Sequence, residues 1–163
     1  MSGAVVAWRI AAQTRDRRAN DLSGNGSARY PGRWNEAGQR VVYAASTIAL
    51  AVLETAAHVN PLGLPLDRFV VRIEIPKAVY AKREVLDPAA MDPGWSAIPA
   101  GRAGVEVASA WHRRGGSAVL LAPSVIVPEE RVVLINATHP DAAKIKAVVQ
   151  RPFHYASIFR RAS

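Results

Sequence analysis

The chain contains no cysteine, and this absence excludes several kinds of chemistry. None of its 163 residues can form a disulfide, act as a thiolate nucleophile or bind zinc through sulfur. It also has no uninterrupted apolar run of about 18 residues, the length that a membrane-spanning helix requires. The N-terminal stretch 4–12 contains Trp8 and Arg9, which interrupt the apolar core that a signal peptide needs. We therefore expect a cytoplasmic protein with no membrane partner.

Acidic residues are also scarce, with 13 Asp and Glu against 21 Lys and Arg and a net charge of +8. Such an excess favours an anionic partner, which can be a nucleic acid, a phosphorylated small molecule or an acidic protein. The basic residues are spread along the chain without a lysine-rich tail or a long basic helix, so we expect no direct contact with nucleic acid. The four histidines lack the i, i+4 spacing of a zinc-binding helix, and we expect no metal.

Hydrophobic periodicity predicts an α+β fold, formed by a single domain over residues 1–163. Apolar or alternating runs predict strands, and spacing of three to four residues predicts helices. The polar segment 14–40 and the proline-rich segment 76–99 are expected to be irregular. The predicted strands are 4–12, 41–44, 68–75, 118–122 and 131–135, and the predicted helices are 48–58, 104–114 and 141–150.

Glu54 is the only fully charged residue between Arg40 and Asp67, and it lies on a predicted helix that Ser46 or Thr47 can cap. Helical spacing puts Leu50, Leu53, Glu54 and Ala57 on one apolar face. An unpaired carboxylate there would cost several kcal/mol. Two interpretations remain: Glu54 pairs with an arginine or turns to a wet edge, or it lines a cavity that binds a ligand.

Three further positions have both a structural and a functional interpretation. The loop 24–35 combines glycines with Arg29 and Arg33, which suits either an anion site or a plain surface loop. Tyr43, on a predicted strand, can belong to the core or offer its ring for stacking. Ser124 follows a proline at a strand end, where serines usually form turns, and no nucleophile elbow surrounds it.

A series of short motifs follows a fixed order along the chain, and the series is more specific than any one member. It comprises Gly32-Arg33-Trp34-Asn35, Val42-Tyr43-Ala44, Ala51-Val52-Leu53-Glu54, Pro123-Ser124, Leu134-Ile135-Asn136 and His139-Pro140. In this order the motifs resemble the RES domain, a family named for an arginine, a glutamate and a serine. These fall on Arg33, Glu54 and Ser124, and the similarity extends from Trp8 to Phe153.

The resemblance implies a mixed or antiparallel sheet core with flanking helices, similar to the ADP-ribosyltransferase fold. It also implies an NAD-binding domain and an enzyme that cleaves the nicotinamide–ribose bond of NAD⁺. Glu54 is then expected to stabilise the positive charge that develops on the ribose. Ser124 is expected to orient Glu54 or to hydrogen-bond a ribose hydroxyl.

The same resemblance implies a set of NAD-binding side chains. Arg33 and Arg9 are expected to hold the diphosphate, and Tyr43 to stack on the nicotinamide. Trp34 and Asn136, which lie in the matching motifs, complete the expected set. Arg33 and Tyr43 are thus expected both to bind the substrate and to take part in catalysis.

Members of the family are toxins of bacterial toxin–antitoxin pairs. The resemblance therefore implies a cognate antitoxin, with a helix-turn-helix region, that blocks the active site. The acceptor of the ADP-ribosyl group stays open among water, phosphate and a target protein. Two other functions also remain open: an RNA-binding or RNA-cleaving toxin, and a non-enzymatic module whose basic face meets an acidic partner.

Overall fold

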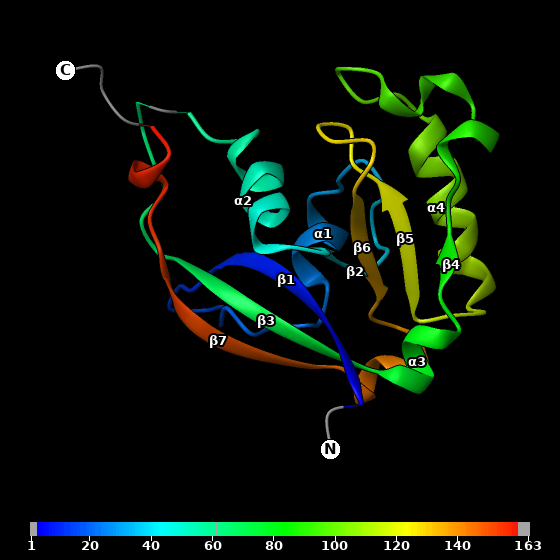
Figure 1. The fold of residues 1–163 in the computed structure, drawn as a ribbon, viewed down its shortest axis with the longest axis horizontal. Coiled ribbons are helices and arrows are strands. Elements are labelled where there is room, and N and C mark those ends of the chain that lie inside the picture. Colours follow the sequence, from blue (N-terminus) through cyan, green and yellow to red (C-terminus); the bar gives the residue numbers. More distant parts are fainter. Residues whose placement is uncertain (1–2, 61, 160–163) are drawn as a thin grey trace.

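The computed structural model describes residues 3–60 and 62–159, and in these ranges seven strands form one mixed sheet (Figure 1). The strands are β1 (Ala4–Ala12), β2 (Val41–Ala45), β3 (Arg68–Pro76), β4 (Glu84–Val85), β5 (Val119–Pro123), β6 (Arg131–Asn136) and β7 (Lys146–Phe153). Their order across the sheet is β4-β5-β6-β2-β1-β3-β7. Only the pair of β4 and β5 is parallel. These findings confirm the predicted α+β class.

Helices precede or follow most of these strands. The α-helices are α1 (Asn25–Arg29), α2 (Ile48–Ala56), α3 (Lys77–Ala81) and α4 (Ala103–Arg114). The 3₁₀ helices are η1 (Pro88–Ala90), η2 (Pro93–Ser96), η3 (Pro140–Lys144) and η4 (Tyr155–Ser157). No helix within residues 3–60 and 62–159 is long and apolar enough to cross a membrane.

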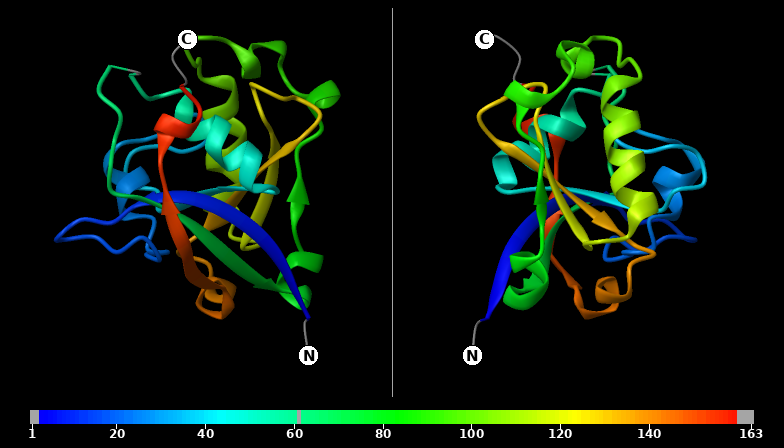
Figure 2. Two further views of the ribbon diagram at one scale, coloured as in Figure 1. Left: turned by 60° about the vertical axis from the view of Figure 1, so that its left-hand side comes forward. Right: turned by 90° about the vertical axis from the view of Figure 1, so that its right-hand side faces the viewer.

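The sheet consists of two halves that meet at one residue pair. Strand β1 pairs with β3 along its whole length. With β2 it forms a single pair in the described residues, between Trp8 of β1 and Ala45 of β2. From this junction the half formed by β1, β3 and β7 diverges from the half formed by β2, β6, β5 and β4 (Figures 1 and 2). The largest buried cluster takes residues from both halves, for example Val71 and Ile73 from β3 with Val133 and Ile135 from β6.

Each half carries one longer helix against its other face. Helix α4 packs through Ala108 and Trp111 on Leu120 and Leu134 of β5 and β6. Figure 2 shows α4 running alongside these strands. Helix α2 packs through Leu50 and Ala51 in a cluster with Ile10, Val70 and Phe153 from the half containing β1, β3 and β7. The two helices therefore lie on different halves of the sheet.

The predicted helix 48–58 is confirmed over most of its length, and its predicted cap is confirmed at Thr47. Helix α2 ends at Ala56, and the Thr47 side chain accepts a hydrogen bond from the Leu50 amide at 3.1 Å. The predicted apolar face is wrong in part, because Leu53 is 43% exposed and Ala57 is also exposed. The helix buries Leu50 and Ala51 instead, so Glu54 lies at the edge of the packed face.

The predicted helix 141–150 is wrong. Residues Pro140–Lys144 form η3, and Lys146–Phe153 form β7, the outermost strand of the sheet beside β3. The pair Val148-Val149 has a β-branched side chain at each position, which favours extended backbone. Pro152 is compatible with this strand because an edge strand can lack one amide donor. Most of β7 is exposed, which explains why it shows no clear alternation of apolar and polar residues.

Both segments that were expected to be irregular contain short elements. The polar segment 14–40 includes α1, and the segment 76–99 includes α3, β4, η1 and η2. Helix α4 begins at Ala103 and ends before Gly115, whose φ of +62° is the left-handed conformation of a helix C-cap. The predicted helix 104–114 is thereby confirmed with its glycine stop.

Candidate active site

Glu54 and Ser124 form the central contact of the candidate site. The serine hydroxyl donates to Glu54 Oε1 at 2.5 Å, joining α2 to the end of β5 across 70 residues of sequence. Ser124 is fully buried, and its oxygen also accepts from the amides of Ile126 and Val127 at 3.1 and 3.0 Å. Its one proton is therefore directed to the carboxylate. The expectation that Ser124 orients Glu54 agrees with this geometry.

Arg33 lies in the loop before β2 and is held through one nitrogen of its guanidinium group. Nη1 donates to the carbonyl oxygens of Trp95 and Ala97 at 3.0 and 2.9 Å. Partial burial lowers the pKa of Arg33, and the negative charge of Glu54 acts in the opposite direction. Arg33 stays protonated at neutral pH. Ser124 thus contacts Glu54 directly, whereas Arg33 interacts with Glu54 through charge alone, without an ion pair between them.

Tyr43 uses its hydroxyl to hold the loop that carries Arg33. The hydroxyl donates to Asn35 Oδ1 at 2.7 Å and accepts from the Trp34 amide at 3.0 Å. A Cβ atom at Gly32 would lie 2.8 Å from this hydroxyl, so the loop approaches the ring closely because residue 32 lacks a side chain. Burial raises the pKa of Tyr43, which keeps the phenol neutral.

Arg9 and Tyr43 line a cavity of about 70 Å³ between the diverging strands β1 and β2. Arg17, Arg18 and Asp21 also line it, so the cavity is rich in positive charge. The Arg9 guanidinium donates to the Asp21 carbonyl oxygen at 3.2 Å. Burial lowers the pKa of Arg9, which the Asp21 charge opposes and the Arg17 charge reinforces. Arg9 is therefore positioned beside Tyr43 and faces this cavity.

Trp34 and Asn136 do not join these residues. Trp34 is 3% exposed, and its ring packs in the core on Trp95 with ring centroids 6.4 Å apart. Asn136 is the last residue of β6, whereas Ser124 lies near the first residue of that strand, because Arg131 pairs with Pro123. Its amide group bonds the His112 carbonyl oxygen and the Thr138 hydroxyl. One side chain thus lies in the core and the other closes a turn, and their contact with NAD⁺ stays a prediction.

Asn35 is a site residue that the sequence analysis did not select. It is 1% exposed, and its Oδ1 accepts from the Gly32 amide at 2.8 Å as well as from Tyr43. Its Nδ2 donates to the carbonyl oxygens of Ser27, Glu36 and Gln39. Its place in the Gly32-Arg33-Trp34-Asn35 motif was the signal in the sequence, but asparagine is also common in exposed turns, and nothing in the sequence showed that this one is buried.

The described residues include no group of three or more His, Asp or Glu side chains that could hold a metal ion. The expected substrate-binding residues fall in two places: a hydrogen-bonded carboxylate whose charge acts on Arg33, and a separate basic cavity that Arg9 and Tyr43 line. Such a combination suits a ligand that carries both a sugar ring and phosphate groups.

Comparison with known proteins identifies the family. The RES domain model matches residues 6–156, and the chain therefore belongs to the RES domain family. It is 51% identical to a "Prs ADP-ribosylating toxin" of Sphingobium sp. (strain YBL2) over 91% of this chain and 92% of that protein. It is 36% identical to a "Toxin Res" of Pseudomonas putida (strain KT2440) over 90% of this chain and 94% of that protein.

A solved structure shares the fold. The crystal structure of the M. tuberculosis MbcT–MbcA toxin–antitoxin complex contains a chain that matches with a TM-score of 0.55 and 17% sequence identity. The match covers 93% of this chain and 84% of that one. At this identity the likeness concerns the fold alone. It supports the arrangement of the sheet and helices described above.

Proposed function

We propose that this protein is the toxin of a toxin–antitoxin pair and cleaves the nicotinamide–ribose bond of NAD⁺. The hydrogen bond between Ser124 and Glu54 supports the proposal most directly. It fixes a carboxylate at the edge of α2, where its charge acts on the guanidinium of Arg33. Oε1 is occupied by the serine, which leaves Oε2 to accept a ribose hydroxyl.

Glu54 acts in this proposal on the charge that forms at the ribose. As the bond between C1′ and the pyridinium nitrogen breaks, nicotinamide leaves with the electron pair and positive charge develops on C1′ and the ring oxygen. A carboxylate held in a partly buried site stabilises that charge more than one in water would. Ser124 is fully buried, so we assign it the positioning of Glu54 rather than attack on the substrate.

Arg33, Arg9 and Tyr43 bind the substrate in this proposal. The guanidinium of Arg33 holds one phosphate of the diphosphate through the nitrogens that its carbonyl contacts leave available. Arg9 meets the substrate at the cavity that it lines with Tyr43. The Tyr43 hydroxyl is bonded to the Arg33 loop, so its ring rather than its hydroxyl is assigned to the ligand.

We further propose that the acceptor of the ADP-ribosyl group is a protein. The support is the 51% identity to a relative whose name describes an ADP-ribosylating toxin. In this reaction a nucleophilic atom of the acceptor forms a bond to C1′, and its proton passes to solvent. Two relatives at 51% and 36% identity carry the name of toxins, which supports an antitoxin as the second partner.

The test compares the wild-type protein with Glu54→Gln and with Glu106→Gln, a control that changes an exposed carboxylate on α4. Each protein is incubated with NAD⁺ and a cell lysate, and nicotinamide release and protein-bound ADP-ribose are measured by mass spectrometry. We expect Glu54→Gln to lower nicotinamide release by about 100-fold or more. We expect Glu106→Gln to match the wild type.

Full activity of Glu54→Gln would contradict the assignment of the carboxylate. Free ADP-ribose as the only product would contradict a protein acceptor and indicate water. A wild-type protein that cleaves RNA and leaves NAD⁺ intact would overturn the proposal and favour the RNA-directed toxin.

A further inference from the structure

The loop 31–40 carries Arg33 but contains no helix or strand that would fix its position. Arg33 must nevertheless lie at a defined distance from Glu54, because a misplaced charge binds its ligand poorly. The backbone on the two sides of Arg33 is anchored to two side chains, Asn35 and Tyr43, which are hydrogen-bonded to each other. Asn35 accepts from the Gly32 amide, and it bonds Tyr43, whose hydroxyl accepts from the Trp34 amide.

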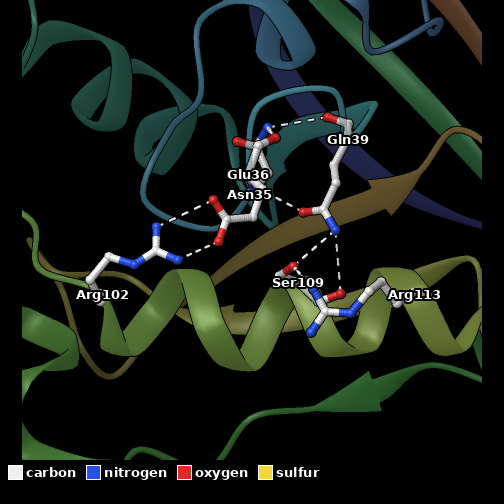
Figure 3. Close-up of polar contacts among 6 residues, drawn as sticks. All are labelled: Asn35, Glu36, Gln39, Arg102, Ser109 and Arg113. Atoms are coloured by element: carbon white, nitrogen blue, oxygen red, sulfur yellow. Dashed lines mark hydrogen bonds and ion pairs between the residues drawn. The ribbon is translucent and has the colours of Figure 1, made fainter.

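Beyond Asn35, the same loop is attached to helix α4 at two points (Figure 3). The carboxylate of Glu36 forms a two-pronged ion pair with the guanidinium of Arg102, the residue that caps the start of α4. The Gln39 side chain donates to the Ser109 hydroxyl at 2.9 Å and accepts from the Glu36 amide at 2.9 Å. These contacts hold both ends of 36–39 against one face of the helix.

The contact at Ser109 is itself supported. The guanidinium of Arg113 donates to the same hydroxyl at 2.7 Å from the next turn of α4. Ser109 is fully buried, so its contacts are shielded from water. Helix α4 packs on the sheet through Trp111 and therefore offers the loop a rigid support.

We propose that Glu36 and Gln39, held on α4 by Arg102 and Ser109, are positioning residues that set the place of Arg33 in the active site. The proposal rests on the proposed function, in which Arg33 binds the diphosphate of NAD⁺. Glu36 and Arg102 are 37% and 64% exposed in their side chains, and exposed ion pairs contribute little to global stability. Their loss is therefore expected to act on substrate binding more than on folding.

The chain offers a closely matched control at the other end of α4. Arg114 pairs with Glu84 at 2.8 Å, and their side chains are 58% and 38% exposed. Reversing the charge of Arg114 thus removes a similar ion pair from the same helix, away from the loop of Arg33. Arg102→Glu and Arg114→Glu differ mainly in the segment with which each arginine forms its ion pair: the loop of Arg33 in the first case and β4 in the second.

The experiment measures KM and kcat for NAD⁺ cleavage with Arg102→Glu, Glu36→Arg, the double variant and Arg114→Glu. We expect each single reversal at the Glu36–Arg102 pair to raise KM about tenfold with a smaller change in kcat. The double variant restores the pair with its charges exchanged, and KM should return to within about twofold of the wild type. Arg114→Glu should keep the wild-type KM.

Hydrogen exchange of the peptide covering 31–40 gives a second readout that does not require turnover. We expect faster exchange in Arg102→Glu and unchanged exchange in Arg114→Glu. An unchanged KM and unchanged exchange in Arg102→Glu would overturn the proposal, as would a failure of the double variant to recover. A wild-type protein without NAD⁺ cleavage would overturn the proposed function, while faster exchange in Arg102→Glu would still support the attachment of the loop to α4.

Discussion

Substitution of Ser124 by alanine tests the central contact of the site. The change removes the hydroxyl that donates to Glu54 at 2.5 Å and accepts from the Ile126 and Val127 amides. Glu54 loses the bond that fixes its rotamer, and the two amides lose their acceptor. The substitution should therefore lower both catalytic activity and stability, by amounts that can be worked out separately.

A hydrogen bond to a charged group contributes about 1.5–3 kcal/mol, and 1.4 kcal/mol corresponds to a factor of ten in rate. If the carboxylate needs this bond in the transition state, kcat should fall by about 10- to 150-fold. Leaving buried amides without an acceptor costs about 1–3 kcal/mol. For a chain of 163 residues this predicts a Tm lowered by about 2–4 °C for each kcal/mol.

Ser117→Ala is the matched control. Ser117 is 1% exposed and lies before β5, whereas Ser124 lies after it. The Ser117 hydroxyl also donates to a carboxylate, that of Glu84, at 2.9 Å. We expect both variants to lower Tm in a thermal melt. At an assay temperature well below either Tm, only Ser124→Ala should lower kcat for nicotinamide release. An unchanged kcat in Ser124→Ala, or an equal loss in Ser117→Ala, would refute the role given to the serine.

Three further changes address other parts of the structure. Tyr43→Phe keeps the ring, and with it any stacking on nicotinamide, but leaves the buried Trp34 amide without its acceptor. The KM for NAD⁺ should therefore rise, and an unchanged KM would contradict the loop-holding role. Gly24→Ala introduces a Cβ atom 2.7 Å from the Arg40 carbonyl carbon at a φ of +72°, and the strain should lower stability by about 2 kcal/mol or more in a urea titration. Burial lowers the pKa of His112, so below about pH 6.5 the unfolded chain binds more protons than the folded one. The free energy of unfolding should thus fall between pH 7 and pH 5, and His112→Gln should reduce this slope; an equal slope in both proteins would argue against the assignment.

Much of the sheet could be predicted from the sequence because its strands are either alternating or wholly apolar. Five predicted strands correspond to β1, β2, β3, β5 and β6, and the capped helix after β2 was also foreseen. Strand β7 was missed because it is exposed along most of its length and lies at the edge, where packing imposes no alternation. The helix predicted over 141–150 is replaced from Lys146 onward by a strand that pairs with β3.

The candidate site was accessible from the sequence only in part. Motif order assigned Arg33, Glu54 and Ser124, and of these the structure joins Glu54 and Ser124 by a hydrogen bond. Periodicity could not have shown that Glu54 meets Ser124, because that contact depends on how α2 packs after the chain turns. The exposure of Leu53 was missed for the same reason.

The junction at Trp8 and Ala45 has a mechanical consequence. The two half-sheets share one backbone residue pair and are otherwise held together by the buried side chains of the largest core cluster. The bond from Ser124 to Glu54 joins these two halves, since α2 packs on residues of β1 and β3 as well as on Ala45 of β2, and the serine follows β5. The position of the Glu54 carboxylate relative to Ser124 therefore depends on side-chain packing between the two half-sheets, and not only on the hydrogen bonds within the sheet.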